Sequence, residues 1–272
     1  MNKLNKDELK GYLLKGMSSR DIENVTGVKY YNVLKYINEY NLNSFNKHNK
    51  VNYKDVNYFN KIDTKEKAYI LGFLLGDGCL EKREHVTVSV ALNDIAILEF
   101  IQKETGCNIT TSTKYDKKKK QFPNASIHIG NPTLCRDIKK LFGGRLKEER
   151  HIPIIKKELE PYLLQGFFDA EGCITWGIRK DRHRIWQKVS FTSQYKMLEG
   201  IQNIFIKNNI STKIRPKSNS KCFVMEIASK NEVLKILDLI YSDKDFIILE
   251  RKYMKSNALR LELEDFGGTT NQ

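Results

Sequence analysis

The sequence predicts an α+β fold in which a helix–strand–strand–helix–strand–strand–helix unit occurs twice, after a small all-helical segment. An apolar run of one type appears two times, as AYILGFLLGDG at residues 68–78 and as YLLQGFFDAEG at residues 162–172. Further along each half, LEFIQ at residues 98–102 is echoed by LEGIQ at residues 198–202. Repeated segments at a domain-sized interval indicate an internal duplication.

The N-terminal segment is expected to form three short helices, at about residues 6–15, 18–25 and 29–40. Ser18 or Ser19 can cap the second helix, because a serine oxygen accepts a hydrogen bond from an unpaired backbone N–H. Gly27 provides a tight turn before the third helix. The expected inward face consists of Ile22, Val25, Val28, Val33, Leu34 and Ile37.

This segment is similar to the helix-turn-helix units of resolvases and phage regulators, in the stretch MSSRDIENVTGVKYYNVLKYINEYNL. Glu23 departs from that pattern, since those units usually have a small residue at the turn. The resemblance implies a DNA-binding domain over residues 1–45 whose third helix reads the major groove. The implied contacts are Arg20, Lys29, Tyr30, Asn32 and Lys35. An ordinary helical cap without DNA contacts is the alternative interpretation.

Residues 46–66 continue an Asn- and Lys-rich stretch with little hydrophobic period, which is typical of a linker. The apolar run that follows has almost no polar face, and such a helix must be buried on every side. Gly72 and Gly76 stand four residues apart, as do Gly166 and Ala170. These small residues would let the two helix backbones approach closely.

Each apolar run ends in an acid and a glycine. Asp77 and Glu171 would lie at the negative ends of helix dipoles, where a carboxylate is disfavoured by about 0.3–1 kcal/mol. Two such placements at matched positions suggest a compensating cation, because paired carboxylates commonly hold Mg²⁺ against a phosphate. The alternative is a buried helix pair with solvated acidic ends. Gly78 and Gly172 are expected in the left-handed conformation that ends a helix.

The remainder of the first half alternates strand and helix patterns. Val86, Val88 and Val90 alternate with polar residues, which predicts a half-buried strand. A helix at about residues 94–105 follows, then strands near 108–114 and 124–130 and a helix at about 132–142. Corresponding residues of the two halves are 94 positions apart at the two acids and 100 positions apart at the LEFIQ and LEGIQ segments. We therefore expect the first hairpin of the second half to be about six residues longer, with a charged and aromatic insertion.

Residues 70–78 (ILGFLLGDG) and 164–172 (LQGFFDAEG) resemble the two signature helices of the LAGLIDADG homing endonucleases, in their single-chain form. Leu75 stands where the family often has a second acid. The resemblance covers about residues 65–265 and implies a pseudo-two-fold αββαββα core with two saddle-shaped antiparallel sheets. The implied boundaries are 67–146 for the first repeat, 147–160 for a linker, 161–265 for the second repeat and 266–272 for a tail.

The resemblance also implies the chemistry. Asp77 and Glu171, with the backbone carbonyls of Gly76 and Ala170, would coordinate Mg²⁺, for which Mn²⁺ would substitute, and an activated water would attack a phosphate on each DNA strand. By position, Lys147 and Lys252 would be the basic residue that each half places near the metal. Exposed helix lysines are the alternative for both.

The free face of each sheet is expected to contact DNA, because the major groove admits a two-stranded ribbon. Polar residues that alternate along the predicted strands, and two arginines of the longer hairpin, are the candidates. They are Thr87, Ser89, Ser126, His128, Arg182, Arg184, Lys188, Ser190, Lys213 and Arg215.

The composition favours a nucleic-acid partner: 47 Lys and Arg against 33 Asp and Glu give a net charge of +14. Neither apolar run approaches the roughly 18 residues of a membrane span. Five cysteines without paired metal spacing indicate reduced thiols in an intracellular protein. With no targeting segment apparent, we expect the cytoplasm or nucleoid of a bacterial or phage-infected cell, or an organelle.

These observations favour a monomeric, Mg²⁺-dependent, sequence-specific endonuclease for double-stranded DNA. Two alternatives remain open: a maturase that binds its own intron RNA and assists splicing, and a non-cleaving DNA-binding regulator on the same scaffold. The presence of both acids favours the endonuclease. A protein that only bound nucleic acid would be better served by Asn or Ser at these positions, because neutral residues do not repel a phosphate.

Overall fold

A computed structural model describes residues 4–14, 17–40, 42, 53–81, 85–115, 121–179, 184–218 and 220–265 of the chain. The chain divides into two compact units, residues 1–52 and 53–272. Each unit has its own cluster of buried apolar residues, so each can be considered by itself.

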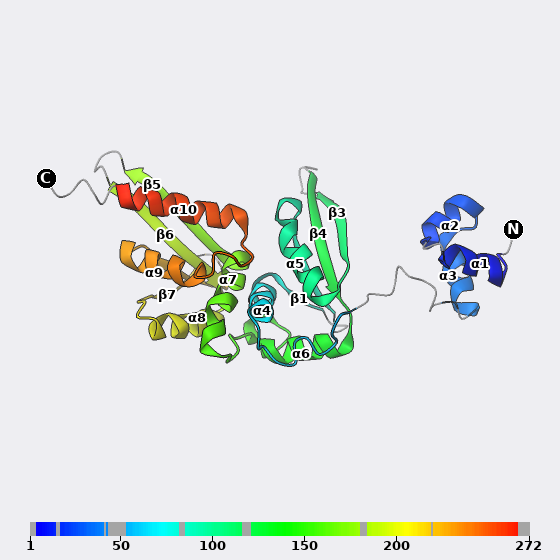
Figure 1. Cartoon of the computed structure of the whole chain (residues 1–272), viewed down its shortest axis with the longest axis horizontal. Coiled ribbons are helices and arrows are strands. Elements are labelled where there is room, and N and C mark those ends of the chain that lie inside the picture. Colours follow the sequence, from blue (N-terminus) through cyan, green and yellow to red (C-terminus); the bar gives the residue numbers. More distant parts are fainter. Residues whose placement is uncertain are drawn as a thin grey trace. The chain divides into compact units, whose positions relative to one another are not determined.

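The first unit contains α1 (Lys6–Leu14), α2 (Ser19–Thr26) and α3 (Tyr30–Glu39), drawn in blue in Figure 1. Ser18 caps α2, because its side-chain oxygen accepts a hydrogen bond from Asp21 N while the Asp21 carboxylate accepts one from Ser18 N. Gly27 follows α2 with a φ of +70°, as the predicted turn requires.

Two residues expected inside this unit lie outside. Val25 is 63% exposed and Leu34 is 40% exposed. In α3 the buried residues are Val33 and Ile37, four positions apart on one face. Leu34 lies about 100° further round the same helix than Val33, so it falls outside the narrow buried face of α3.

The second unit repeats one order of elements. Its first half contains α4 (Lys65–Asp77), β1 (Cys79–Leu80), β2 (Val86–Ala91), α5 (Ile95–Thr105), β3 (Ile109–Tyr115), β4 (Gln121–Ile129) and α6 (Pro132–Phe142). The second half contains α7 (Glu160–Glu171), β5 (Gly172–Arg179), β6 (Arg184–Ser193), α8 (Tyr195–Lys207), β7 (Ile214–Pro216), β8 (Phe223–Ile227) and α9 (Lys230–Ile240), followed by α10 (Glu250–Asp265). Short 3₁₀ turns lie at Leu92–Asp94, Lys147–Glu149 and Lys157–Leu159. The duplicated α+β fold predicted from the sequence is confirmed.

Each half forms a four-stranded antiparallel sheet, in the orders β1-β2-β4-β3 and β5-β6-β8-β7. The α4–α7 pair lies between the two sheets in Figure 1. Helix α5 packs on the first sheet, and α8, α9 and α10 pack on the second. Val86 and Val88 point into the core, so the opposite side of that sheet carries the polar residues of the same strand. No helix among the described residues is long and apolar enough to cross a membrane.

Helices α4 and α7 touch through backbone atoms. A Cβ atom on Gly72 would lie 2.0 Å from the carbonyl oxygen of Leu163, and a Cβ on Gly166 would lie 2.0 Å from that of Tyr69. Real side chains do not approach a carbonyl this closely, so only glycine fits at both crossing positions. The expected contact along small residues is present.

The expectation that Gly78 and Gly172 are left-handed is wrong. Their φ angles are −69° and −81°, and the chain continues from both in extended backbone toward the next strand. At both positions glycine is required because there is no space for a Cβ atom, and not because of the φ angle. A Cβ would lie 2.3 Å from Leu74 O at Gly78, and 2.0 Å from the buried Phe168 ring at Gly172.

Adding a methyl group at the helix crossing tests its importance. Gly166→Ala should lower the free energy of unfolding by about 1–3 kcal/mol or more, since the backbone of α4 must move to admit the Cβ. Gly130→Ala is the matched control, because its Cβ would meet only the His85 ring, at 3.7 Å. Urea denaturation of both variants measures the difference; equal stabilities would show that the crossing tolerates a wider separation.

Candidate active site and nucleic-acid interface

The two motif acids are placed at the same end of the α4–α7 pair. Asp77 is the last residue of α4 and Glu171 is the last residue of α7. Gly76 packs directly against the other helix, because a Cβ there would lie 2.5 Å from the Ala170 Cβ and 3.0 Å from the Glu171 Cγ. The helix crossing therefore brings the two carboxylates together at one end of the seam.

The site raises the pKa of Asp77 to about 6. Asp77 is exposed, but nearby protein removes part of the hydration of its carboxyl, and this is the first cause; the second is the negative charge of Glu171. Lys252, Lys147 and Arg251 act in the opposite direction. A cation bound here would offset the negative charge that disfavours ionisation of Asp77.

Lys147 contacts the ends of both motif helices. Its Nζ donates a hydrogen bond to the carbonyl oxygen of Gly76 at 3.4 Å and lies 3.7 Å from a carboxylate oxygen of Glu171. The side chain belongs to the Lys147–Glu149 turn and is exposed. An exposed ammonium on a flexible stem can move toward an anion at little cost.

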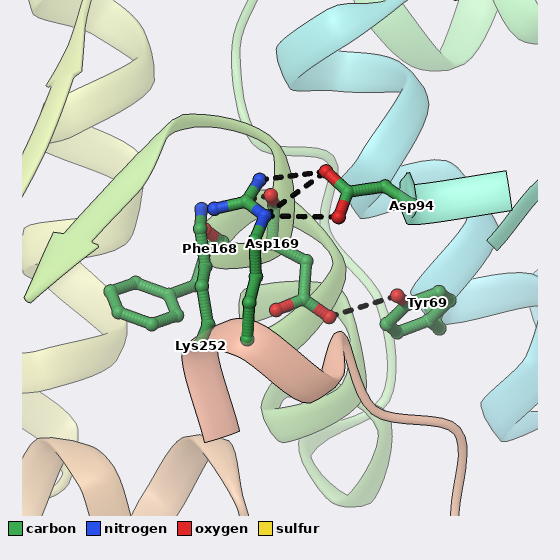
Figure 2. A network of polar contacts seen from close by, with 6 residues as sticks. Tyr69, Asp94, Phe168, Asp169 and Lys252 are labelled. Atoms are coloured by element: carbon green, nitrogen blue, oxygen red, sulfur yellow. Dashed lines mark hydrogen bonds and ion pairs between the residues drawn. The ribbon is translucent and has the colours of Figure 1, made fainter. Parts of the chain in front are cut away.

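Lys252 is buried and occupies a different position. Its Nζ donates to the carbonyl oxygens of Phe168 at 2.6 Å and Asp169 at 2.8 Å, at the end of α7, and lies 5.3 Å from the centroid of the Phe168 ring (Figure 2). Burial lowers the pKa of Lys252 to about 8, although the charges of Asp169 and Asp77 act against this. A cation on the last carbonyls of a helix offsets the negative end of its dipole.

Arg150 makes the corresponding contacts at the end of α4, and it was not predicted from the sequence. Its Nη1 donates to the carbonyl oxygens of Leu75 at 3.2 Å and Gly78 at 2.9 Å, and the side chain is buried. The last carbonyls of each motif helix are thus hydrogen-bonded to a buried cationic side chain from a distant segment of the chain. No local pattern marks Arg150, because its role is defined by carbonyls about seventy residues earlier in the chain.

A polar network lies beside the acids, also unpredicted. Tyr69 donates to one oxygen of the buried Asp169 carboxyl at 2.9 Å, and burial raises the pKa of Asp169 to about 7 (Figure 2). Arg251 of α10 donates Nε and Nη2 to the Asp94 carboxylate at 2.9–3.0 Å, which ties the second repeat to the first. Asp77, Asp94, Asp169 and Arg251 line one cavity of about 230 Å³.

The donor set fits a hard divalent cation. Two carboxylates and the backbone oxygens at Gly76 and Ala170 would offer a cation only oxygen ligands, which Mg²⁺ prefers. Among the described residues there is no cluster of three or more His, Cys, Asp or Glu side chains that could hold a metal alone. A cation at this site would therefore depend on backbone oxygens and on the substrate to complete its coordination.

The free face of the first sheet carries a continuous polar surface. Thr87 lies opposite His128, with 3.2 Å between Oγ1 and Nδ1, and Ser89 lies opposite Ser126, with 2.7 Å between the hydroxyl oxygens. Ser112 donates to Asn124 at 2.6 Å on the same face. Ser89 and Asn124 also line a hollow of about 420 Å³. All four predicted residues of this sheet therefore share one face, on which His128 is exposed, Thr87 and Ser89 are half-buried and Ser126 is buried.

The second sheet carries a more basic surface. Lys188, Lys213 and Arg215 line a hollow of about 330 Å³ together with Glu226. Ser190 lies opposite Glu226 in the strand register. Arg182 lies outside the described residues, and of Arg184 only the backbone is described, as the start of β6. Glu226 was not among the predicted residues, although the alternation in FVMEI places it on this face.

In the first unit, the predicted DNA contacts are on the surface of α2 and α3. Arg20 and Tyr30 are exposed, and the Arg20 guanidinium lies 5.9 Å from the centroid of the Tyr30 ring. Lys29 lies 3.3 Å from Glu23 and Lys35 lies 3.7 Å from Glu39. Asn32 is half-buried. Glu23, the departure from the helix-turn-helix pattern, is thus paired with one of the candidate contacts.

The raised pKa of Asp77 predicts how stability depends on pH. Because this carboxyl binds a proton more tightly in the folded protein than in the unfolded chain, its contribution to stability falls as pH rises from about 4 to about 6. Asp77→Asn should therefore be more stable than the wild type at pH 8 without divalent cations, and the difference should disappear near pH 4. Thermal denaturation across this range measures it, with Asp245→Asn as an exposed control. A pH-independent difference would contradict the origin given for the shift.

Comparison with known proteins agrees with this geometry. Residues 158–241 match the family model of the LAGLIDADG-like domain. No curated protein matches the chain by sequence. The crystal structure of the LAGLIDADG homing endonuclease I-SmaMI bound to cleaved DNA is similar, with 12% identity and a TM-score of 0.52 over 78% of this chain and 93% of that one.

A second structure of I-SmaMI, bound to an uncleaved DNA target with calcium ions, has 12% identity and a TM-score of 0.51 over 77% of this chain and 95% of that one. At such low identity the likeness establishes the fold alone. Residues 158–241 match the model of a LAGLIDADG-like domain, and the second unit has the two-repeat fold of the LAGLIDADG homing endonucleases.

Proposed function

We propose that the chain is a metal-dependent, sequence-specific endonuclease that cleaves both strands of a long, asymmetric DNA site. The observation that carries the proposal is the pair of carboxylates, Asp77 and Glu171, brought together by the glycine crossing of α4 and α7. The family match over the second repeat supports it, as do the DNA-bound neighbours of the same fold.

Asp77 and Glu171, with the carbonyl oxygens of Gly76 and Ala170, would hold Mg²⁺, and Mn²⁺ would substitute because it accepts the same ligands. A cation bound there would supply positive charge beside the scissile phosphate and would acidify a water molecule. One chain provides both acids, so a monomer suffices.

The basic residues have separate roles in this proposal. Lys147 is exposed and already faces Gly76 and Glu171, so it can approach the phosphate and stabilise its developing charge. Lys252 and Arg150 are buried against helix carbonyls and position the acids by fixing the ends of α7 and α4. Lys252 is thus assigned to the α7 end rather than to an exposed helix surface.

The two polar sheet faces would bind the major groove on either side of the acids, as a β-ribbon fits a groove of this width. The net charge of +14 favours binding to the phosphate backbone. In the first unit, the exposed surface of α2 and α3 would add a second DNA contact, to which the exposed Arg20, Tyr30 and Lys35 would contribute.

The proposal predicts separable effects on cutting and binding. Asp77→Asn and Glu171→Gln should each abolish cleavage of a random duplex library in Mg²⁺ while retaining, or tightening, DNA binding at low salt, because each removes a negative charge that faces phosphate. Glu199→Gln, an exposed acid on α8, is a control with the same change in charge and should cut normally. Either site variant cutting both strands at the wild-type rate would refute the assignment; wild-type binding without cutting would indicate the regulator instead.

A second test concerns the first unit. The double variant Arg20→Ala, Lys35→Ala should weaken DNA binding and reduce the slope of log K against log salt by about 0.9 for each phosphate that the protein no longer neutralises. Lys6→Ala, an exposed lysine of α1, should leave the slope unchanged. Titrations from low to high salt measure both variants. A slope equal to that of the wild type would show that this surface of α2 and α3 does not touch DNA.

A further inference from the structure

Glu226 is an unusual residue for the surface on which it lies. It is the only acid in the eight described strands of the two sheets. Its neighbours Met225 and Ile227 point into the core, so Glu226 points to the opposite, free face of the second sheet. Lys188, Lys213 and Arg215 surround the same hollow.

Glu226 forms a close pair with Lys188 of the adjacent strand. The Lys188 Nζ donates to Glu226 Oε1 at 2.7 Å, and the two side chains are 39% and 43% exposed. Among the described residues the other carboxylate oxygen accepts no hydrogen bond. The pair therefore presents one acceptor and the remaining donors of one ammonium group, side by side, to whatever binds this face.

Stability gives little reason for this pair. An ion pair with both partners this exposed contributes roughly 0–1 kcal/mol. The pair would also weaken binding to phosphates, because its carboxylate repels the DNA backbone and neutralises the lysine that would attract that backbone. A carboxylate on a DNA-binding face is useful where it meets the edge of a base, since cytosine N4 and adenine N6 are donors in the major groove.

The pair of groups matches one base pair in particular. The major-groove edge of a C·G pair presents the cytosine N4 donor beside the guanine O6 and N7 acceptors. A glutamate accepts from cytosine N4, and a lysine donates to guanine O6 and N7. A salt-bridged lysine and glutamate thus have their acceptor and donor next to each other in the arrangement that a C·G edge requires.

We propose that Lys188 and Glu226 together read one C·G base pair, with Glu226 facing the cytosine and Lys188 facing the guanine. This inference rests on the proposed function, because it requires the second sheet to lie in the major groove. The pair has no counterpart in the first sheet, where the equivalent positions in the strand register are Thr87 and Ser126, which carry hydroxyl groups. The base pair should therefore be specified in one half of the site only.

Selection of bound duplexes from a random library tests this, with the full-length chain in EDTA so that DNA is bound and not cut. The wild type should enrich a sequence containing a C·G pair in one half-site. Glu226→Gln should reduce the preference for cytosine at that position by about tenfold and admit adenine there, because a glutamine amide pairs with adenine N6 and N7. Lys188→Met should relax the same position. Other positions should be unchanged.

Glu199→Gln on α8 is again the control for the change in charge, and its enriched sequence should equal that of the wild type. A Glu226→Gln profile equal to the wild-type profile would overturn this inference and leave the endonuclease proposal intact. A uniform gain in affinity without a change at one position would also overturn it, since that would indicate a general charge effect. A wild type that enriches no sequence would overturn the proposed function and this inference with it.

Discussion

The backbone contact between α4 and α7 sets the separation of the two motif acids, and the second unit is arranged around it. Gly72 and Gly166 remove the side chains that would hold the helices apart, so each helix presents a bare peptide to the other's carbonyl oxygen. The acids sit one or two turns further on, where the helices emerge from the core. A shift of the crossing would therefore displace the carboxylates directly.

The ends of these helices are electrostatically unfavourable when considered alone, because each places a carboxylate at the negative end of a helix dipole. Arg150 and Lys252 offset this by donating to the last carbonyls of α4 and α7 from buried positions. They do not bond to the carboxylates themselves, and desolvation, followed by the charge of Glu171, raises the pKa of Asp77. The fold thus places positive charge at the ends of both helices while Asp77 stays exposed and Glu171 stays half-buried.

The two halves share a scaffold but differ in surface chemistry. The first sheet presents mainly hydroxyl and imidazole groups, with Glu81 accepting a hydrogen bond from Thr87, whereas the second presents ammonium and guanidinium groups around Glu226 and Glu232. The helix pair is matched between the two halves, whereas the outward strand positions carry different residues. Because outward positions do not contribute to the core, they can change with little effect on stability.

The sequence by itself determined the duplicated α+β fold, the buried motif helices, the strand faces and the two acids, because these follow from local periodicity and from a repeat with constant spacing. It failed at Gly78 and Gly172, where local preference suggested a left-handed cap and the crowding by Leu74 and Phe168 imposed an extended one. Only the tertiary structure identified Arg150, Asp169 and the Arg251–Asp94 pair, and only it joined Lys188 to Glu226. Each of these is defined by a partner far away in the chain, and periodicity carries no information about which distant residues a fold brings into contact.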